Sequence, residues 1–185
     1  MKRPLLAAVG ALAALAFGAP QALAACPAQP LDQTFRPWLD PAYYQAAPDS
    51  GFEAGGSWVL AGGATVVDGN QPFLAGTRSL DLPPGSSATT APICVTVAHP
   101  TIRFFARNAG AALSPLIVTV QFKTLLGLQL ELPVGVVLGG GEWQPTLPLL
   151  MLGNLLSNEV RFRLTAAPDS AWQVDDVYVD PYSKG

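Results

Sequence analysis

Residues suited to catalysis are scarce in this 185-residue chain. The single histidine, His99, precedes Pro100 and has no carboxylate nearby in the sequence, so we expect it in a surface loop and not as the base of a nucleophile. Asp175 and Asp176 are adjacent on an expected strand, where successive side chains point to opposite faces. They are therefore not expected to act together as the two carboxylates of a glycosidase. These patterns favour a binding protein over an enzyme.

The basic residues follow a second pattern, because they lie on the polar faces of three expected strands. If the three strands share one sheet, these residues form a basic face that would suit an acidic glycan or wall polymer. The ordinary alternative is that each pairs with a neighbouring carboxylate such as Glu131 or Glu159, for under about 1 kcal/mol. The five residues are Arg103, Arg107, Lys123, Arg161 and Arg163.

Trp143 is the aromatic residue best placed to stack on a sugar ring. It follows the loop Gly139–Gly141 and stands between Glu142 and Gln144, so an exposed ring would have hydrogen-bonding groups beside it. The ordinary alternative is packing in the core, which is the usual place of large aromatic side chains.

The N-terminus has the parts of a secretory signal peptide. Lys2 and Arg3 supply positive charge, residues 5–17 form an apolar stretch, and residues 22–24 match an A-x-A cleavage pattern. The apolar stretch is shorter than the about 20 residues that a transmembrane helix needs. We therefore expect residues 1–25 to be removed, leaving a secreted protein without a transmembrane segment.

The two cysteines allow two interpretations. Export to an oxidising compartment favours a disulfide between Cys26 and Cys94. Residues 23–26 also resemble a bacterial lipobox, in which Cys26 would carry a lipid anchor. The disulfide is favoured, because the Pro-rich segment after Cys26 contains Phe35 and Trp38 and does not look like a polar tether.

The elements that must position these residues are strands. With 18 Gly and 18 Pro the chain cannot be a helical bundle, and a composition that is half hydrophobic with 12% charged residues can fill a core. Short alternating segments separated by turn residues predict an all-β fold, an antiparallel β-sandwich in one domain over residues 51–182. A Pro- and Tyr-rich lead-in, residues 26–50, precedes it, and a short capping turn is expected over residues 149–156. The expected strands are 58–60, 64–67, 77–82, 87–98, 101–108, 116–126, 128–138, 159–165 and 172–179.

The order of short motifs adds a resemblance. Gly51-Phe52-Glu53 is followed by Trp58, then by Gly-Thr-Arg-Ser-Leu at residues 76–80, and finally by Trp-Gln-Val-Asp-Asp-Val at residues 172–177. This order resembles the galactose-binding-like jelly roll of many carbohydrate-binding modules. The C-terminal motif also resembles a group of uncharacterised secreted bacterial proteins. The resemblance implies a jelly roll that binds glycans, while the site residues must be argued one by one.

Such modules often hold a structural calcium ion at the rim of the sandwich. The resemblance implies ligands at Glu53, at the backbone carbonyls around Gly76 and Arg78, and at Asp175. The alternative is that Arg78 or backbone N–H groups satisfy both carboxylates without a metal.

Asp175 also has a physical reason to need a partner. By alternation it shares a strand face with Val177 and Val179, so we expect its carboxylate to point inward with them. A buried carboxylate needs a cation or several hydrogen-bond donors.

Three function classes follow. The favoured one is a secreted, non-catalytic module that binds carbohydrate at the cell envelope, with a possible structural calcium ion as its cofactor. The alternative is a structural or adhesive envelope protein, and a small glycan hydrolase or lyase is less favoured. The acidic surplus, 13 Asp and Glu against 10 Lys and Arg, argues against a nucleic-acid partner.

Overall fold

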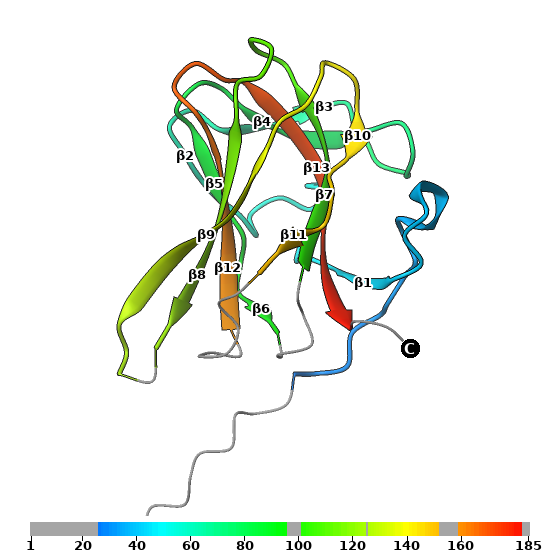
Figure 1. The fold of residues 1–185 in the computed structure, drawn as a ribbon, viewed down its shortest axis with the longest axis vertical. Helices are drawn as coiled ribbons and strands as arrows, with labels where there is room; N and C mark the ends of the chain where they lie inside the picture. Colours follow the sequence, from blue (N-terminus) through cyan, green and yellow to red (C-terminus); the bar gives the residue numbers. More distant parts are fainter. Residues whose placement is uncertain (1–25, 96–100, 125, 152–158, 183–185) are drawn as a thin grey trace, which may run out of the picture.

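The computed structural model describes residues 26–95, 101–124, 126–151 and 159–182 as a jelly-roll β-sandwich of two antiparallel sheets (Figure 1). The predicted signal peptide and His99 lie outside the described residues. Within these ranges, no helix is both long enough and apolar enough to cross a bilayer.

One sheet has seven strands, in the order β10-β7-β13-β4-β3, with β1 paired to β13 and β11 paired to β7. It is assembled from segments across the whole chain. Its strands are β1 (Tyr43–Ala46), β3 (Thr65–Asp68), β4 (Arg78–Leu82), β7 (Thr101–Asn108), β10 (Gln144–Pro145), β11 (Leu149–Leu150) and β13 (Trp172–Tyr182).

The other sheet has six strands, in the order β2-β5-β12-β8-β9, with β6 paired to β12. In Figure 1, β8, β9 and β12 form one side of the molecule, opposite the N-terminal segment drawn in blue. The strands of this sheet are β2 (Val59–Ala61), β5 (Ser87–Thr89), β6 (Ile93–Cys94), β8 (Leu116–Lys123), β9 (Gln129–Val137) and β12 (Glu159–Ala166).

Each strand predicted from alternation forms, with its ends shifted by a few residues. The segment 87–98 is divided into β5 and β6 around Pro92, because proline has no N–H to donate to a neighbouring strand. The capping turn expected at 149–156 is wrong at its start, since Leu149 and Leu150 pair with β7 as β11. Residues 152–158 lie outside the described residues.

The core fills the space between the sheets, and β7 shows how alternation builds it. Ile102, Phe104 and Ala106 point into the core, as predicted. Phe105 points to the opposite, outer face, where it is also fully buried. Another segment of the chain must therefore cover this part of the outer face.

The lead-in, residues 26–50, provides the cover. It contains a short 3₁₀ helix, η1 (Arg36–Trp38), and then β1, which extends the seven-stranded sheet. Phe35 and Tyr44 from this segment pack with Phe105 in a second apolar cluster. The segment therefore folds as part of the sandwich.

The predicted disulfide is confirmed. Cys26 is bonded to Cys94 on β6, with their Cα atoms 5.5 Å apart. The bond links the start of the lead-in to the six-stranded sheet, and it uses the sulfur that a lipid anchor would require.

Candidate functional site

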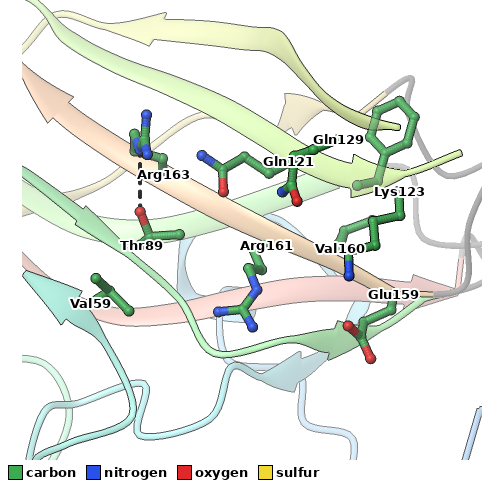
Figure 2. A pocket seen from close by; sticks show the side chains of 10 residues that line it. Val59, Thr89, Gln121, Lys123, Gln129, Glu159, Val160, Arg161 and Arg163 are labelled. Carbon is green, nitrogen blue, oxygen red and sulfur yellow. Dashed lines mark hydrogen bonds between the residues drawn. The ribbon is translucent and has the colours of Figure 1, made fainter. Parts of the chain in front are cut away.

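The outer face of the six-stranded sheet is hollowed into a cleft of about 590 Å³ (Figure 2). Within the described ranges no segment like the lead-in covers this face, so its charged side chains and Gln129 reach solvent, whereas Thr89 and Gln121 are each 8% exposed. The polar and charged residues that line the cleft are Thr89, Gln121, Lys123, Gln129, Glu159, Arg161 and Arg163.

Strand register explains why these side chains lie together. On β12, Val160 and Phe162 point into the core, so Arg161 between them points outward. Arg161 pairs with Gln121 on β8, and Gln121 pairs in turn with Glu131 on β9. A row of polar residues therefore crosses three strands.

A parallel row contains Arg163, whose side chain is held in place. Its Nε donates to Thr89 Oγ1 over 3.3 Å, and its Nη1 lies 3.2 Å from Glu131 Oε2. Glu131 also accepts hydrogen bonds from Thr119 and Gln121. Although burial raises the pKa of Glu131, these hydrogen bonds and the charge of Arg163 lower it overall. Glu131 therefore stays ionised and, from beside the cleft, holds Arg163 and Gln121 in place.

The side chains of Arg161 and Lys123 differ from that of Arg163, because neither forms a hydrogen bond or ion pair with another side chain or backbone group in the described ranges. Arg161 is half-buried on β12 and Lys123 is exposed on β8. Figure 2 shows both side chains in the cleft, on neighbouring strands. Their donors are available to a ligand.

The cleft lacks an aromatic platform. Among the described residues that line it, Phe122 has the only aromatic ring, and this side chain is 2% exposed because it points into the core. Recognition here would depend on hydrogen bonds and charge rather than on ring stacking.

The condition for a single basic face is not met, because the five basic residues are divided between the sheets. Lys123, Arg161 and Arg163 lie on the six-stranded sheet, whereas Arg103 and Arg107 lie on β7 of the other. Strand order in a sandwich is set by pairing between distant segments, which alternation within one segment does not reveal.

Arg103 is not available to a ligand, contrary to its predicted binding role. It is 4% exposed and pairs with Asp40 of the lead-in, which also accepts a hydrogen bond from the Tyr44 hydroxyl. Its Nε donates to the Thr146 carbonyl over 2.8 Å, and its guanidinium lies 4.1 Å from the centre of the Phe35 ring. Arg103 therefore fastens the lead-in to the sheet.

Trp143 and Arg107 lie together on the seven-stranded side. The Arg107 guanidinium lies 5.4 Å from the centre of the Trp143 ring, and its Nε donates to Gln173 Oε1 over 2.8 Å. Trp143 is half-buried and packs against the second apolar cluster. A ligand-binding role for this pair stays a prediction.

Glu53 lies at the turn before β4, as the resemblance implied. Its carboxylate accepts hydrogen bonds from Thr77 N–H and Oγ1 and from Arg78 N–H. The Thr77 N–H, followed by the Thr77 hydroxyl, lowers the pKa of Glu53. A Cβ added to Gly76 would lie 3.1 Å from Glu53 Oε1, so this glycine leaves room for the close approach.

Asp175 is 1% exposed, but its predicted orientation is wrong. Val174 and Val177 both point into the core although they are three residues apart, so alternation breaks between them. The register of β13 shifts after Asp175, and Asp176 adopts a left-handed backbone with φ of 49°, as in a β-bulge. Asp175 therefore does not share a face with Val177 and Val179.

The bulge also overturns the expectation that Asp175 and Asp176 point apart. Gln71 N–H donates to Asp175 Oδ2 over 3.1 Å, and Gln71 Nε2 donates to Asp176 Oδ2 over 2.7 Å. Burial, and then the charges of Asp176 and Glu53, raise the pKa of Asp175 to about 7, although hydrogen bonds from the Gln71 and Asp176 N–H groups act in the opposite direction. The three carboxylates are thus close enough to repel one another.

This donor set is chemically suited to calcium, which prefers carboxylate and carbonyl oxygens. Repulsion among Glu53, Asp175 and Asp176 would be relieved by a cation. However, no three His, Cys, Asp or Glu side chains within the described ranges are placed to hold a metal ion together, so carbonyls would have to complete the site. Calcium stays a prediction, beside the alternative that the N–H groups suffice.

The neutral side chains of the cleft were not predicted as site residues. Thr89, Gln121 and Gln129 were not selected, although alternation already placed Gln121 on the polar face of its strand. Thr89 gave a weaker signal, since it belongs to a segment that Pro92 interrupts. The ion-pair partner of Arg103, Asp40, gave no signal because it lies 63 residues away.

Comparison with solved structures shows the same fold in carbohydrate-binding modules. The CBM22-1 xylan-binding domain of Paenibacillus barcinonensis Xyn10C has a TM-score of 0.56 at 16% identity, covering 73% of this chain and 94% of that domain. A family 11 carbohydrate-binding module from Clostridium thermocellum, in complex with a β-1,3-1,4-mixed-linked tetrasaccharide, has a TM-score of 0.50 at 12% identity. The match covers 77% of this chain and 98% of that module.

A separate xylan-binding domain of family 22 matches with a TM-score of 0.54 at 16% identity, over 79% of this chain and 99% of that domain. No protein-family model and no curated protein sequence matches the chain. The likeness therefore shows that the chain has the sandwich fold of these modules.

Proposed function

We propose that this protein is a secreted, non-catalytic carbohydrate-binding module that holds a glycan in the cleft of the six-stranded sheet. The observation that carries the proposal is the cleft itself. It presents hydroxyl, amide and guanidinium groups from four neighbouring strands on a face that the described chain leaves open. Sugar hydroxyls pair with such groups through hydrogen bonds that fix orientation.

The structural neighbours support the ligand class. Two of them are xylan-binding domains and another was solved with a bound tetrasaccharide. Because fold alone does not determine function, the cleft and the neighbours are both needed for the proposal.

The carboxylates of the cleft favour binding without catalysis. A glycosidase generally needs two carboxyl groups that flank the scissile bond. Of the described residues that line the cleft, Glu159 is the only carboxylate, and nearby Glu131 is engaged by Arg163, Thr119 and Gln121.

A glycan array, followed by calorimetry on the best ligand, tests the proposal with purified full-chain protein. We expect binding that weakens about tenfold when Thr89→Ala and Gln129→Ala are combined, since each removes a hydrogen bond of about 0.5–1.5 kcal/mol. Gln29→Ala, an exposed change in the lead-in, is the matched control. Absence of binding to every glycan would contradict the proposal and favour the structural or adhesive alternative.

A further inference from the structure

The cleft carries positive charge on an acidic protein. Its lining includes Lys123, Arg161 and Arg163 against one carboxylate, Glu159, and it remains net positive when the adjacent Glu131 is counted. The whole chain has a net charge of −3. A positive patch on a negative surface attracts anionic ligands and directs them to that patch.

Of the three cationic side chains, Arg163 is held by the protein, whereas Arg161 and Lys123 are available to a ligand. Arg163 is already engaged by Glu131 and Thr89. Arg161 lies directly opposite Gln121, and Lys123 is two residues further along β8. Arg161 and Lys123 are therefore diagonal neighbours, with Cα atoms roughly 7–8 Å apart on one face. Glu159 lies in the same cleft, two residues before Arg161, so a ligand carboxylate that is bound by both cations would lie beside it.

Neutral sugars gain much of their binding from stacking on aromatic rings, and this cleft presents no exposed ring among its described lining residues. A guanidinium, in contrast, binds a carboxylate through two parallel hydrogen bonds that are stronger than those between neutral groups. The cleft is thus better matched to an anionic sugar than to a neutral one.

We infer that the cleft selects glycans that contain uronic acids, with the sugar carboxylate bound between Arg161 and Lys123. This inference rests on the proposed function, since it specifies the ligand of the same cleft. Gln129, which is exposed and pairs with Lys123 across β8 and β9, is placed to bind a hydroxyl of the same or the next sugar.

The test uses polygalacturonate, alginate and glucuronoxylan, each beside the same polymer after chemical reduction of its carboxyl groups. Neutral xylan and mixed-linkage β-glucan complete the panel. We expect the full-chain protein to bind at least one acidic polymer about tenfold more tightly than its reduced form, the size expected for one charge-assisted contact. Arg161→Gln and Lys123→Gln should each remove most of this preference.

Arg36→Gln is the matched control, because Arg36 is an exposed arginine on η1, outside the cleft. Melting temperatures verify that all three variants fold. Equal affinity for acidic and reduced polymers would overturn the inference and leave the proposed function standing, as would a preference that survives both cleft variants. Failure to bind every polymer, neutral ones included, would overturn both.

Discussion

The two outer faces of the sandwich contain similar residues in different surroundings. On the seven-stranded sheet, Arg103 is buried beneath the lead-in and paired with Asp40. On the six-stranded sheet, Arg161 occupies an equivalent outward position on its strand, and its side chain forms no hydrogen bond or ion pair with another described residue. The comparison shows that an outward arginine becomes a structural or a binding group according to what covers its face.

Covering a face also changes which residues are compatible with it. The covered face holds Phe35, Tyr44 and Phe105 in a buried apolar cluster, and burial of such side chains stabilises the fold by about 1.5–3 kcal/mol each. The open face holds amides, hydroxyls and charges that remain in water. We expect substitutions on the covered face to affect stability and substitutions on the open face to affect binding.

The largest effect is expected from the disulfide, which holds the start of the cover. Replacing both Cys26 and Cys94 with serine should lower the free energy of unfolding by about 4 kcal/mol, because the bond joins residues 68 apart in the sequence and restricts the unfolded chain. Urea denaturation measures the change. The wild type in a reducing agent should match the variant, and a loss below about 1 kcal/mol would mean that packing alone holds the lead-in.

Arg103→Ala should have the next largest effect. It leaves Asp40 without its cation in a largely buried site, and because Asp40 retains some exposure we expect a cost of about 3 kcal/mol, the low end for breaking a buried pair. Arg161→Ala is the matched change on the open face and should alter stability by no more than about 0.5 kcal/mol. Equal losses in the two variants would contradict the distinction between the faces.

The carboxylates around the β13 bulge should respond to calcium. If Glu53 and Asp175 take part in a calcium site, adding calcium should raise the melting temperature and a chelator should reverse the rise, since only the folded state binds the ion. Glu53→Gln should abolish the response. A melting temperature that does not change when calcium is added would show that the Thr77 and Arg78 donors satisfy Glu53 by themselves.

The smallest effect is a change with pH at the ion pair of the covered face. Burial raises the pKa of Asp40, but hydrogen bonds from Tyr44, Ala42 N–H and Arg103 lower it overall below its ordinary value of 3.8. Ionised Asp40 therefore stabilises the fold above that pH, and the contribution disappears as the pH falls through the folded pKa.

Wild type should accordingly have a higher free energy of unfolding than Asp40→Asn at pH 6, and this difference should become smaller below about pH 4. Urea denaturation at both pH values measures the difference. Arg161→Ala, compared with wild type in the same way, should show no such decrease, and a difference that persists unchanged in acid would contradict the role of ionised Asp40.

Much of the fold was predictable from alternation alone. The period of two in residues 101–108, 116–123 and 159–166 marks both the strands and the side chains that enter the core. The expected export and the two cysteines predicted the disulfide. Strand β1 was missed, because its four residues acquire their conformation by pairing with β13 and carry little pattern of their own.

The candidate site was only partly predictable. The alternating pattern placed Arg161, Arg163 and Lys123 on polar strand faces. It placed Arg103 and Arg107 on a polar face as well, so it did not distinguish the cleft residues from the other two. Separating the two groups required the order of strands in each sheet, which depends on pairing between distant segments such as Tyr43 on β1 and Tyr182 on β13.

By itself, the sequence determined which side of each strand is apolar, because that property is local and repeats every second residue. Only the tertiary structure decided which polar side would be covered, since the cover is a contact between residues as distant as Asp40 and Arg103. It also decided the orientation of Asp175, where one bulge breaks the alternation on which the prediction depended. The alternation of residues along a strand predicts its apolar and polar faces, and packing between distant segments decides whether a polar face is covered or open to a ligand.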